Sequence, residues 1–491
     1  MTGFSNAIPS DASYVRIEPG QFAGGTVSLP GSKSLTNRAL LISSLVQGES
    51  ILMNALDCDD SRHLSKALKA LGVRISSEAG GPRCASKDAL NFTVSGGLDG
   101  YSVKEGVYNL GNAGTATRFL TAALTVSGGN YVVDGDERMR QRPIHQLVEA
   151  LRGLGAEVSC PSGCPPVEIG PRVLQGGRVN IAGNTSSQFI SAVLMAAPMA
   201  REDVEVRLVG EVLSAPYLEL TLRTMQDFGV RVDIHDDESD GQLVYHVDSR
   251  KWYKSREYFV EGDASTASYF FAAAALTGTT VRVEGVGKVS RQGDLRFADV
   301  LAQMGCHVKK DVDSITVTGP KEMLEGVVNN CSDMPDIVPT LAVVAAFSRG
   351  RTRLHGVPHL RFKESDRIAS VASELRKLGV EVRELDDGLE INGPDGPDGF
   401  SLHGGRIDSW GDHRIAMALS LAGLLIPGVE IGDPQVVTKS YPGFFTELAT
   451  LGGRSTFHSP GGKEVVAEEV LFQCKYIRHF HELLRLNDQS R

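Results

Sequence analysis

The most constraining feature of the sequence is an internal repeat of about 75 residues. Six segments have the pattern of an amphipathic helix that ends on an apolar residue and then glycine. Glycine suits the position just after a helix, where the backbone takes a positive φ. The residues after each glycine mostly alternate apolar and polar side chains, as strands do. The six glycines, spaced 73 to 83 residues apart, are Gly72, Gly155, Gly229, Gly305, Gly379 and Gly452.

A second pattern keeps the same period. Six apolar helices rich in small residues each follow a polar cluster that is typical of a helix cap. Because these helices are apolar on nearly all sides, we expect them inside each unit, with the glycine-ended helices outside. The cap positions are Ser34, Thr115, Ser187, Ser265, Asp336 and Asp412. Two patterns in step predict an α/β protein of six similar units, each with two helices and several strands.

Composition and charge argue against several classes of function. The chain has 491 residues, of which 41% are hydrophobic, and its net charge of −10 argues against a general binder of nucleic acid or anionic membranes. No apolar run reaches the ~18 residues of a membrane span, and we expect no signal peptide. Seven scattered cysteines lack a second Cys/His pair at zinc-ligand spacing. We therefore expect reduced thiols, no metal, and a cytoplasmic protein.

The beginnings of the apolar helices predict a site for anions. Helix N-termini present free N–H groups and a partial positive charge, which suit phosphate and carboxylate. Any one lysine or arginine would ordinarily be a solvated surface charge, but cations recur at or near these starts in a chain that is acidic overall. This recurrence predicts one cleft for a ligand with several negative charges. The cations are Lys33, Arg38, Arg118, Arg142, Lys363, Arg367, Arg414 and Lys439.

Common catalytic motifs do not account for these cations. The segment PGSKS resembles a phosphate-binding loop, but Ser32 separates Gly31 from Lys33, whereas the Walker A motif has glycine directly before lysine. The dinucleotide, nucleophile-elbow and HExxH zinc motifs are absent from the sequence, so we expect no cofactor. The charge-dense segment RFKESDR (361–367) offers acid and base groups. Cations beside Glu364 would lower its pKa, so this acid needs burial or substrate contact to donate a proton.

Nine segments between about residues 15 and 452 resemble, in order and spacing, the signature segments of 5-enolpyruvylshikimate-3-phosphate (EPSP) synthases. They are LPGSKSLTNRALL, LGNAGTATRFLTAAL, RMRQRPI, SSQFISAVLMAAP, EGDASTASYFFAAAA, GDLRFAD, RFKESDRI, DHRIAMA and KSYPGFF. The resemblance implies the two-domain enolpyruvyl transferase fold, with three βαβαββ-like units per domain around an interdomain cleft and a hinge near Gly31 and Glu261. It divides the chain into 1–31 (first strands of a discontinuous lower domain), 32–260 (upper domain), 261–455 (lower domain) and 456–491 (C-terminal appendage).

The same resemblance implies a reaction and a set of site residues. The family transfers the enolpyruvyl group of phosphoenolpyruvate to the 5-hydroxyl of shikimate-3-phosphate and releases phosphate, on the pathway to chorismate and the aromatic amino acids. The expected catalytic residues are Asp336 as the base for the hydroxyl, Glu364 as the acid for the methylene carbon, and Lys33. Those expected to bind shikimate-3-phosphate are Lys33, Ser34, Arg38, Ser186, Ser187, Gln188, Ser214, Asp336, His359 and Lys363. Those expected to bind phosphoenolpyruvate are Lys33, Asn112, Gly114, Thr115, Arg142, Gln188, Arg367, Arg414 and Lys439.

Two positions depart from the family pattern, and two alternatives stay open. Phe119 stands where proline is common, just after the loop expected to bind phosphoenolpyruvate. This leaves open the response to glyphosate, the family's inhibitor at that site. His359 replaces an asparagine that usually touches the shikimate ring. One alternative is the sister transferase that acts on UDP-N-acetylglucosamine, which typically has a cysteine in the loop corresponding to 138–143, where this chain has none. The other is an inactive binding homologue, which the intact acidic and cationic residues argue against. We expect a monomer whose partners are its two small-molecule substrates.

Overall fold

Six small sheets share one strand pattern: a parallel pair of strands, extended on one side by antiparallel strands. A parallel pair needs a long crossover, whereas antiparallel neighbours need only a turn. Five of the sheets have four strands and one has five, and two helices accompany each sheet, which confirms the predicted α/β fold of six βαβαββ-like units. The computed structural model describes residues 8–80, 86, 89–97, 100–184, 186–210, 212–237, 240–394 and 402–465.

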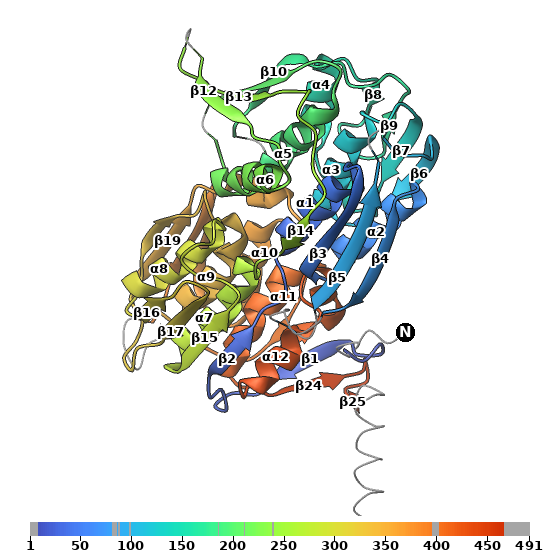
Figure 1. The fold of residues 1–491 in the computed structure, drawn as a ribbon. Coiled ribbons are helices and arrows are strands. Elements are labelled where there is room, and N and C mark those ends of the chain that lie inside the picture. The colour runs from blue at the N-terminus through green and yellow to red at the C-terminus, as the bar shows by residue number, and fades with distance from the viewer. Residues whose placement is uncertain are drawn as a thin grey trace, which may run out of the picture.

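The sheets form two lobes, one above the other in Figure 1. The sheets of the upper lobe, in strand order, are β14 (Glu257–Phe259), β3 (Gly48–Leu56), β5 (Ala89–Gly96) and β4 (Arg74–Ala79); β6 (Glu105–Asn109), β7 (Asn130–Asp134), β9 (Val167–Ile169) and β8 (Val158–Ser159); and β10 (Gly177–Ala182), β11 (Val204–Val209), β13 (Leu243–Val247) and β12 (Asp233–Asp236). Those of the lower lobe are β2 (Gly25–Ser28), β15 (Thr280–Glu284), β17 (Ser314–Thr318) and β16 (His307–Lys310); β18 (Val328–Asn330), β19 (Arg351–His355), β21 (Gly388–Asn392) and β20 (Glu381–Leu385); and β22 (Arg406–Ile407), β23 (Val429–Gly432), β1 (Tyr14–Ile17), β24 (Ser455–His458) and β25 (Glu464–Val465).

Both predicted sets of helices are present. The inner set, in which nearly every residue is buried, comprises α1 (Lys33–Ser44), α3 (Gly114–Leu124), α5 (Ser187–Ala196), α7 (Ala264–Thr277), α9 (Val338–Ala346) and α11 (His413–Ser420). The outer, amphipathic set comprises α2 (Asp59–Ala70), α4 (His145–Gly153), α6 (Ala215–Asp227), α8 (Arg296–Gln303), α10 (Arg367–Lys377) and α12 (Phe444–Thr450). The glycine after each outer helix has a φ between +85° and +111°, as its position in the repeat predicts.

Short 3-10 helices precede several of these elements and carry site residues. They are η1 (Met139–Gln141), η2 (Ala197–Met199), η3 (Gly293–Leu295), η4 (Pro335–Ile337), η5 (Pro358–Phe362), η6 (Leu421–Leu424) and η7 (Pro434–Lys439). Among the described elements, no helix is both long and apolar enough to cross a membrane.

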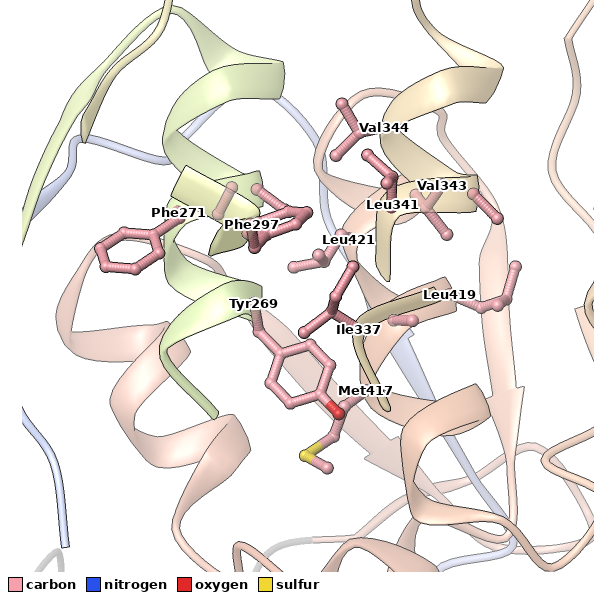
Figure 2. Packing of buried hydrophobic residues seen from close by; sticks show 14 of the residues in the cluster. Tyr269, Phe271, Phe297, Ile337, Leu341, Val343, Val344, Met417, Leu419 and Leu421 are labelled. Carbon is pink, nitrogen blue, oxygen red and sulfur yellow. The ribbon is translucent and has the colours of Figure 1, made fainter. Parts of the chain in front are cut away.

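Two separate clusters of buried apolar side chains form the cores. One draws on residues 35–260, and the other on residues 15–29 together with 264–451. Figure 2 shows part of the second cluster, where Tyr269 of α7, Leu341 of α9 and Met417 of α11 lie together. On the basis of these two cores we propose that the described residues 8–31 and 261–465 form one domain and residues 32–260 the other.

The chain crosses between the lobes twice, and the strands beside the crossings are exchanged. Strand β2 precedes α1 in sequence but pairs with β15 below, whereas β14 precedes α7 but pairs with β3 above (Figure 1). The two crossings lie side by side, because Gly31 pairs with Gly262 and the Ser32 N–H donates to the Glu261 carbonyl at 2.7 Å. A Cβ on Gly31 would lie 2.1 Å from the Asn54 carbonyl oxygen, so this close approach requires glycine.

The last sheet continues past residue 455, which corrects the predicted start of the appendage. Strand β24 pairs with β1, with Tyr14 opposite His458, and β25 pairs with β24. The rings of Tyr14 and His458 stack with centroids 4.8 Å apart. An uncovered edge on β1 would expose unpaired backbone groups, and β24 covers it. Residues 456–465 therefore belong to the fold, and the rest of the predicted appendage lies outside the described residues.

Candidate active site

A polar cavity lies between the two lobes, and it is lined mainly by helix starts. The starts of α1, α3, α5 and α11 contribute, together with η4, which leads into α9. Six lysines and arginines and three carboxylates line it, which leaves an excess of positive charge suited to anions. The lining residues are Lys33, Ser34, Arg38, Asp60, Gly114, Thr115, Arg142, Ser186, Ser187, Gln188, Ser214, Tyr217, Pro335, Asp336, His359, Lys363, Glu364, Arg367 and Arg414.

Two of the predicted site residues lie just behind the lining. The Lys439 ammonium donates to the Asn112 carbonyl at 2.5 Å and pairs with Asp60 at 3.1 Å. The Asn112 side-chain oxygen accepts a hydrogen bond of 3.0 Å from Arg142. Asn112 and Lys439 therefore hold Arg142 and Asp60, which line the cavity.

Asp60, at the start of α2, was missed by the sequence analysis. Its carboxylate lies between Lys33, at 3.4 Å, and Lys439. Burial disfavours the ionised carboxyl, but Lys33 and then Lys439 outweigh it, and the pKa of Asp60 is lowered. Two buried lysines beside the same helix start need a nearby acid, and this requirement is the signal that could have identified it.

Arg367 is the hub that connects the predicted base with the predicted acid. It is 2% exposed, and it donates to Asp336 at 3.0 Å, to Glu364 at 2.8 Å and to Asp412 at 2.8 Å. Arg414 adds a hydrogen bond of 2.7 Å to the other oxygen of Asp336. Asp412 also caps α11 by accepting from the Arg414 backbone N–H. Asp412, at the start of α11, therefore helps to position both Arg367 and Arg414.

These cations keep both predicted catalytic carboxyls ionised. Burial would raise the pKa of Asp336, but Arg414, Lys363 and Arg367 outweigh it and hold the pKa well below its usual value. Burial likewise opposes ionisation of Glu364, but Arg142 and Arg367 lead the charges that keep its pKa well below 4.5. The lowered pKa expected from the cations around Glu364 is thus found.

The opposite side of the cavity is formed by hydroxyl and amide groups. Ser186 caps α5 by accepting from the Gln188 backbone N–H, and the Gln188 side chain donates to the Thr115 hydroxyl at 3.3 Å. Ser214 precedes α6 with a φ of +59°. The His359 side chain is half-buried, and its two ring nitrogens are buried with no hydrogen-bond partner among the described residues. Burial and then Lys363 lower the pKa of His359 to about 3, so its ring is neutral at physiological pH.

Arg38 lines the cavity, but most of its N–H groups bind the protein. It donates to the Thr221 hydroxyl at 2.8 Å and to the carbonyls of Ser34 and Tyr217, both at 3.0 Å. Burial lowers the pKa of Arg38 to about 10. Phe119 lies under this guanidinium, 5.2 Å from ring centroid to Cζ. The phenylalanine that departs from the family pattern therefore packs against a predicted shikimate-3-phosphate residue.

Tyr217 is a second lining residue that the sequence analysis missed. It lies one turn after Ser214 on α6, and the i, i+3 spacing on that helix is the signal that could have identified it. Its hydroxyl lies 3.3 Å from Asp336 and 3.1 Å from Asp294, across the cleft.

Within the described ranges, no group of three His, Cys, Asp or Glu side chains could hold a metal ion.

Comparison with known proteins gives one consistent result. The family model described as EPSP synthase (3-phosphoshikimate 1-carboxyvinyltransferase) matches residues 17–448. A 3-phosphoshikimate 1-carboxyvinyltransferase from Tolumonas auensis is 45% identical over 89% of this chain and 99% of its own length. A chloroplastic protein of the same name from Brassica napus is 43% identical over 90% of this chain and 85% of its own length.

Solved structures agree with this match. The EPSP synthase of Acinetobacter baumannii has a TM-score of 0.72 and 28% identity, and the match covers 90% of this chain and 99% of that one. The enolpyruvyl transferase NikO of Streptomyces tendae also has a TM-score of 0.72, over 91% and 99% of the two chains. Its identity is 18%, so this second likeness concerns the fold alone.

Proposed function

The chain belongs to the EPSP synthase (3-phosphoshikimate 1-carboxyvinyltransferase) family, and we propose that its cleft transfers the enolpyruvyl group of phosphoenolpyruvate to the 5-hydroxyl of shikimate-3-phosphate. Phosphate is released, and the product leads toward chorismate and the aromatic amino acids. The family match and the relatives support this activity. The observation that carries it is the gathering of six cations and three carboxylates at the helix starts of one cavity.

Phosphoenolpyruvate binds on the side of the cavity where α3 begins. Its phosphate and carboxylate are held by Lys33, Arg142, Arg367 and Arg414, since guanidinium groups bind both anions through paired hydrogen bonds. Asn112, Thr115, Gln188 and Lys439 complete this subsite. A Cβ on Gly114 would lie 2.6 Å from the Arg142 guanidinium, which supports a need for glycine where Arg142 lies against the helix start.

Shikimate-3-phosphate binds on the side formed by α1, α5 and α6. Its phosphate meets hydroxyl groups and cations that line the cavity there. Gln188 lies between the two substrates, because its amide reaches Thr115 of α3. The neutral His359 offers one donor and one acceptor to the ring hydroxyls. The residues of this subsite are Lys33, Ser34, Arg38, Ser186, Ser187, Gln188, Ser214, Asp336, His359 and Lys363.

The reaction proceeds by addition and then elimination. Glu364 gives a proton to the methylene carbon of phosphoenolpyruvate, while the 5-hydroxyl oxygen attacks the neighbouring carbon and loses its proton to Asp336. The resulting tetrahedral intermediate returns a methyl proton to Glu364, the carbon–carbon double bond re-forms, and phosphate leaves. Lys33 and the surrounding arginines stabilise the charge that moves onto the phosphate. Exclusion of water by the closed cleft protects the intermediate.

Substrate binding itself prepares the acid and the base. Arg142 pairs with Glu364, and Arg367 and Arg414 pair with Asp336, which makes Glu364 a poor proton donor and Asp336 a weak base. Phosphoenolpyruvate competes for the same arginines and brings its own negative charge. Both effects raise the pKa of the two carboxyls, because a nearby anion disfavours ionisation. Binding therefore protonates Glu364 and makes Asp336 more basic.

We also propose a monomer in the cytoplasm. Both predicted catalytic carboxyls and six cations already meet between two lobes of one chain, so the proposed reaction requires no second subunit. The five described cysteines are free thiols, as is usual in a reducing compartment.

The direct test of the function is an assay of phosphate release with defined substrate pairs. We expect release from phosphoenolpyruvate with shikimate-3-phosphate and none with UDP-N-acetylglucosamine. Release with the nucleotide sugar alone would overturn the proposal in favour of the sister transferase. Binding of both phosphorylated substrates without release would indicate an inactive homologue.

A further inference from the structure

A second buried carboxyl lies behind the predicted base, in a place that the reaction described above does not use. Asp294, on η3, is 4% exposed and accepts hydrogen bonds from the Ser265 hydroxyl and, at 3.1 Å, from the Tyr217 hydroxyl, both at the same oxygen. Its other oxygen is buried without a hydrogen-bond partner among the described residues. The Tyr217 hydroxyl also lies 3.3 Å from Asp336. Tyr217 therefore bridges two carboxyl groups.

The number of available protons distinguishes the two carboxyls. A phenol has one proton, so it donates to one carboxyl, and the second contact is attractive only when that carboxyl is protonated. Asp336 is held ionised by ion pairs with Arg367 and Arg414. In the part of the chain that the structure describes, no ion pair joins Asp294 to a cation. An additional proton in this group of three therefore resides on Asp294.

We propose that Asp294 is the final acceptor of the proton that Asp336 removes from the 5-hydroxyl, and that Tyr217 passes the proton between the two carboxyls. This inference rests on the proposed function. Asp294 does not touch the substrate, so it is a positioning residue that acts through Tyr217. Asp336, clamped by two arginines, holds a proton poorly, and the relay removes that proton from it.

The transfer leaves atoms and charges balanced. The O–H bond of the substrate breaks as its oxygen bonds to carbon, and the proton moves to Asp336. Asp336 then gives a proton to the Tyr217 oxygen, while Tyr217 gives its own to Asp294. Asp336 returns to a carboxylate, Tyr217 remains a neutral phenol, and Asp294 becomes a neutral acid. Burial raises the pKa of Tyr217 well above its usual value, so the phenol does not ionise in this exchange.

The surroundings of Asp294 suit a group that gains and loses a proton near neutral pH. The charged groups that face it are Asp336 on η4, Arg414 at the start of α11 and Asp263 at the cap of α7. Burial and then the charge of Asp336 raise the pKa of Asp294 to about 7, while Arg414 and the Ser265 hydroxyl oppose the rise. Asp294 is thus ionised, and able to accept a proton, above about this pH.

Closure of the cleft assembles the relay. Tyr217 belongs to α6 of the upper lobe, whereas Asp294 and Asp336 belong to the lower lobe. Opening separates the phenol from both carboxyls and allows Asp294 to release its proton to solvent. Proton transfer is therefore coupled to the closed state in which the substrates react.

The test is the pH dependence of kcat at saturating substrates, measured by phosphate release. In the wild type, kcat rises with pH as Asp294 ionises. The midpoint of this rising limb lies at or above about 7, because the bound anionic substrates also disfavour the ionised carboxyl. Asp294→Asn removes this limb and lowers kcat at least tenfold at pH 8, while KM for shikimate-3-phosphate changes less than threefold. Ser265→Ala moves the limb to higher pH, because the carboxylate loses a hydrogen bond that favours its ionised form. Tyr217→Phe lowers kcat similarly, and the Asp294→Asn/Tyr217→Phe double variant is no slower than the slower single variant.

Asp299→Asn is the matched control, since this exposed acid on α8 pairs with Lys310 at 2.6 Å, outside the cavity. It retains the wild-type profile. The relay is overturned if Asp294→Asn keeps both the rise of kcat with pH and the wild-type kcat, or if Ser265→Ala does not shift the midpoint of that rise. It is also overturned if the factors by which Asp294→Asn and Tyr217→Phe lower kcat multiply in the double variant. Thermal melting checks that each variant is folded. An inactive wild type would overturn the proposed function itself, whereas an active wild type with an unaffected Asp294→Asn would overturn the relay alone.

Discussion

Replacing Arg138 with alanine tests how the closed cleft holds its acid in place. Arg138 precedes η1 in the upper lobe, and its guanidinium donates to two carbonyls of the lower lobe. It reaches the Lys363 carbonyl at 2.8 and 3.2 Å and the Glu364 carbonyl at 3.0 Å. These bonds fix the backbone of the predicted acid and exist only when the lobes are together. Their loss should favour the open state.

The size of the effect follows from the contacts. A hydrogen bond from a charged donor contributes about 1.5 to 3 kcal/mol, and the half-buried side chain favours the lower value. Two carbonyl acceptors then give about 3 kcal/mol for the closed state relative to the open one. At about 1.4 kcal/mol per factor of ten, closure weakens roughly 100-fold. We expect kcat/KM for both substrates to fall on that order when closure precedes chemistry.

The assay is steady-state phosphate release by Arg138→Ala, with Arg140→Ala as the control. Arg140 lies two residues away, but its side chain is 56% exposed and pairs with Asp134 on its own lobe. The control should stay within twofold of the wild type, because an exposed pair contributes little. Arg138→Lys should recover part of the loss, since one ammonium can reach one carbonyl. If Arg138→Ala matches the control, these bonds do not stabilise the reactive state.

Three further predictions concern the charges in the cavity. Glu364→Gln should lower kcat by a factor of about 10² to 10⁴, the usual contribution of a general acid, and leave substrate affinity near normal. A variant that keeps its turnover would exclude Glu364 as the proton donor. Because phosphoenolpyruvate raises the pKa of Glu364 on binding, calorimetry in buffers of different ionisation enthalpy should show net proton uptake, and proton release would contradict this sign. Affinity for phosphoenolpyruvate should fall as ionic strength rises, and a flat salt response would argue against recognition by the cationic cavity.

The repeat made most helices predictable but could not reveal strand partners. A period of about 75 residues locates every inner and outer helix, because each needs its own cap or glycine. It cannot show that β2 and β14 exchange lobes, since the exchange depends on how the chain crosses at Gly31 and Gly262. The last sheet also extends into residues predicted to be an appendage, because β1 needs a partner from the far end of the chain.

The site was predictable where a residue carries a family motif, and less so where its role depends on a tertiary contact. Six of the eight predicted cations line the cavity, together with Ser34, Ser186, Ser187 and Ser214, and Lys439 lies just behind it with Asn112. Arg118 does not line it, because its guanidinium donates to the Pro143 carbonyl instead. Asp60 and Tyr217 lie in segments whose local pattern gives only helix starts and faces. Asp294 lies in the family segment GDLRFAD, to which the sequence analysis assigned no role. Their importance comes from partners distant in sequence, such as Lys439 for Asp60. Charge balance in a buried cluster is a property of the assembled fold, which a single segment does not encode.

The most direct test of the account is a crystal structure of the Glu364→Gln variant with shikimate-3-phosphate and phosphoenolpyruvate bound. We expect both ligands in the one cavity between the lobes, with the anionic groups of phosphoenolpyruvate on Arg142, Arg367 and Arg414 and the ring of shikimate-3-phosphate beside Asp336. Either ligand bound elsewhere, or those arginines turned away from phosphoenolpyruvate and still clamped on the carboxylates, would contradict it.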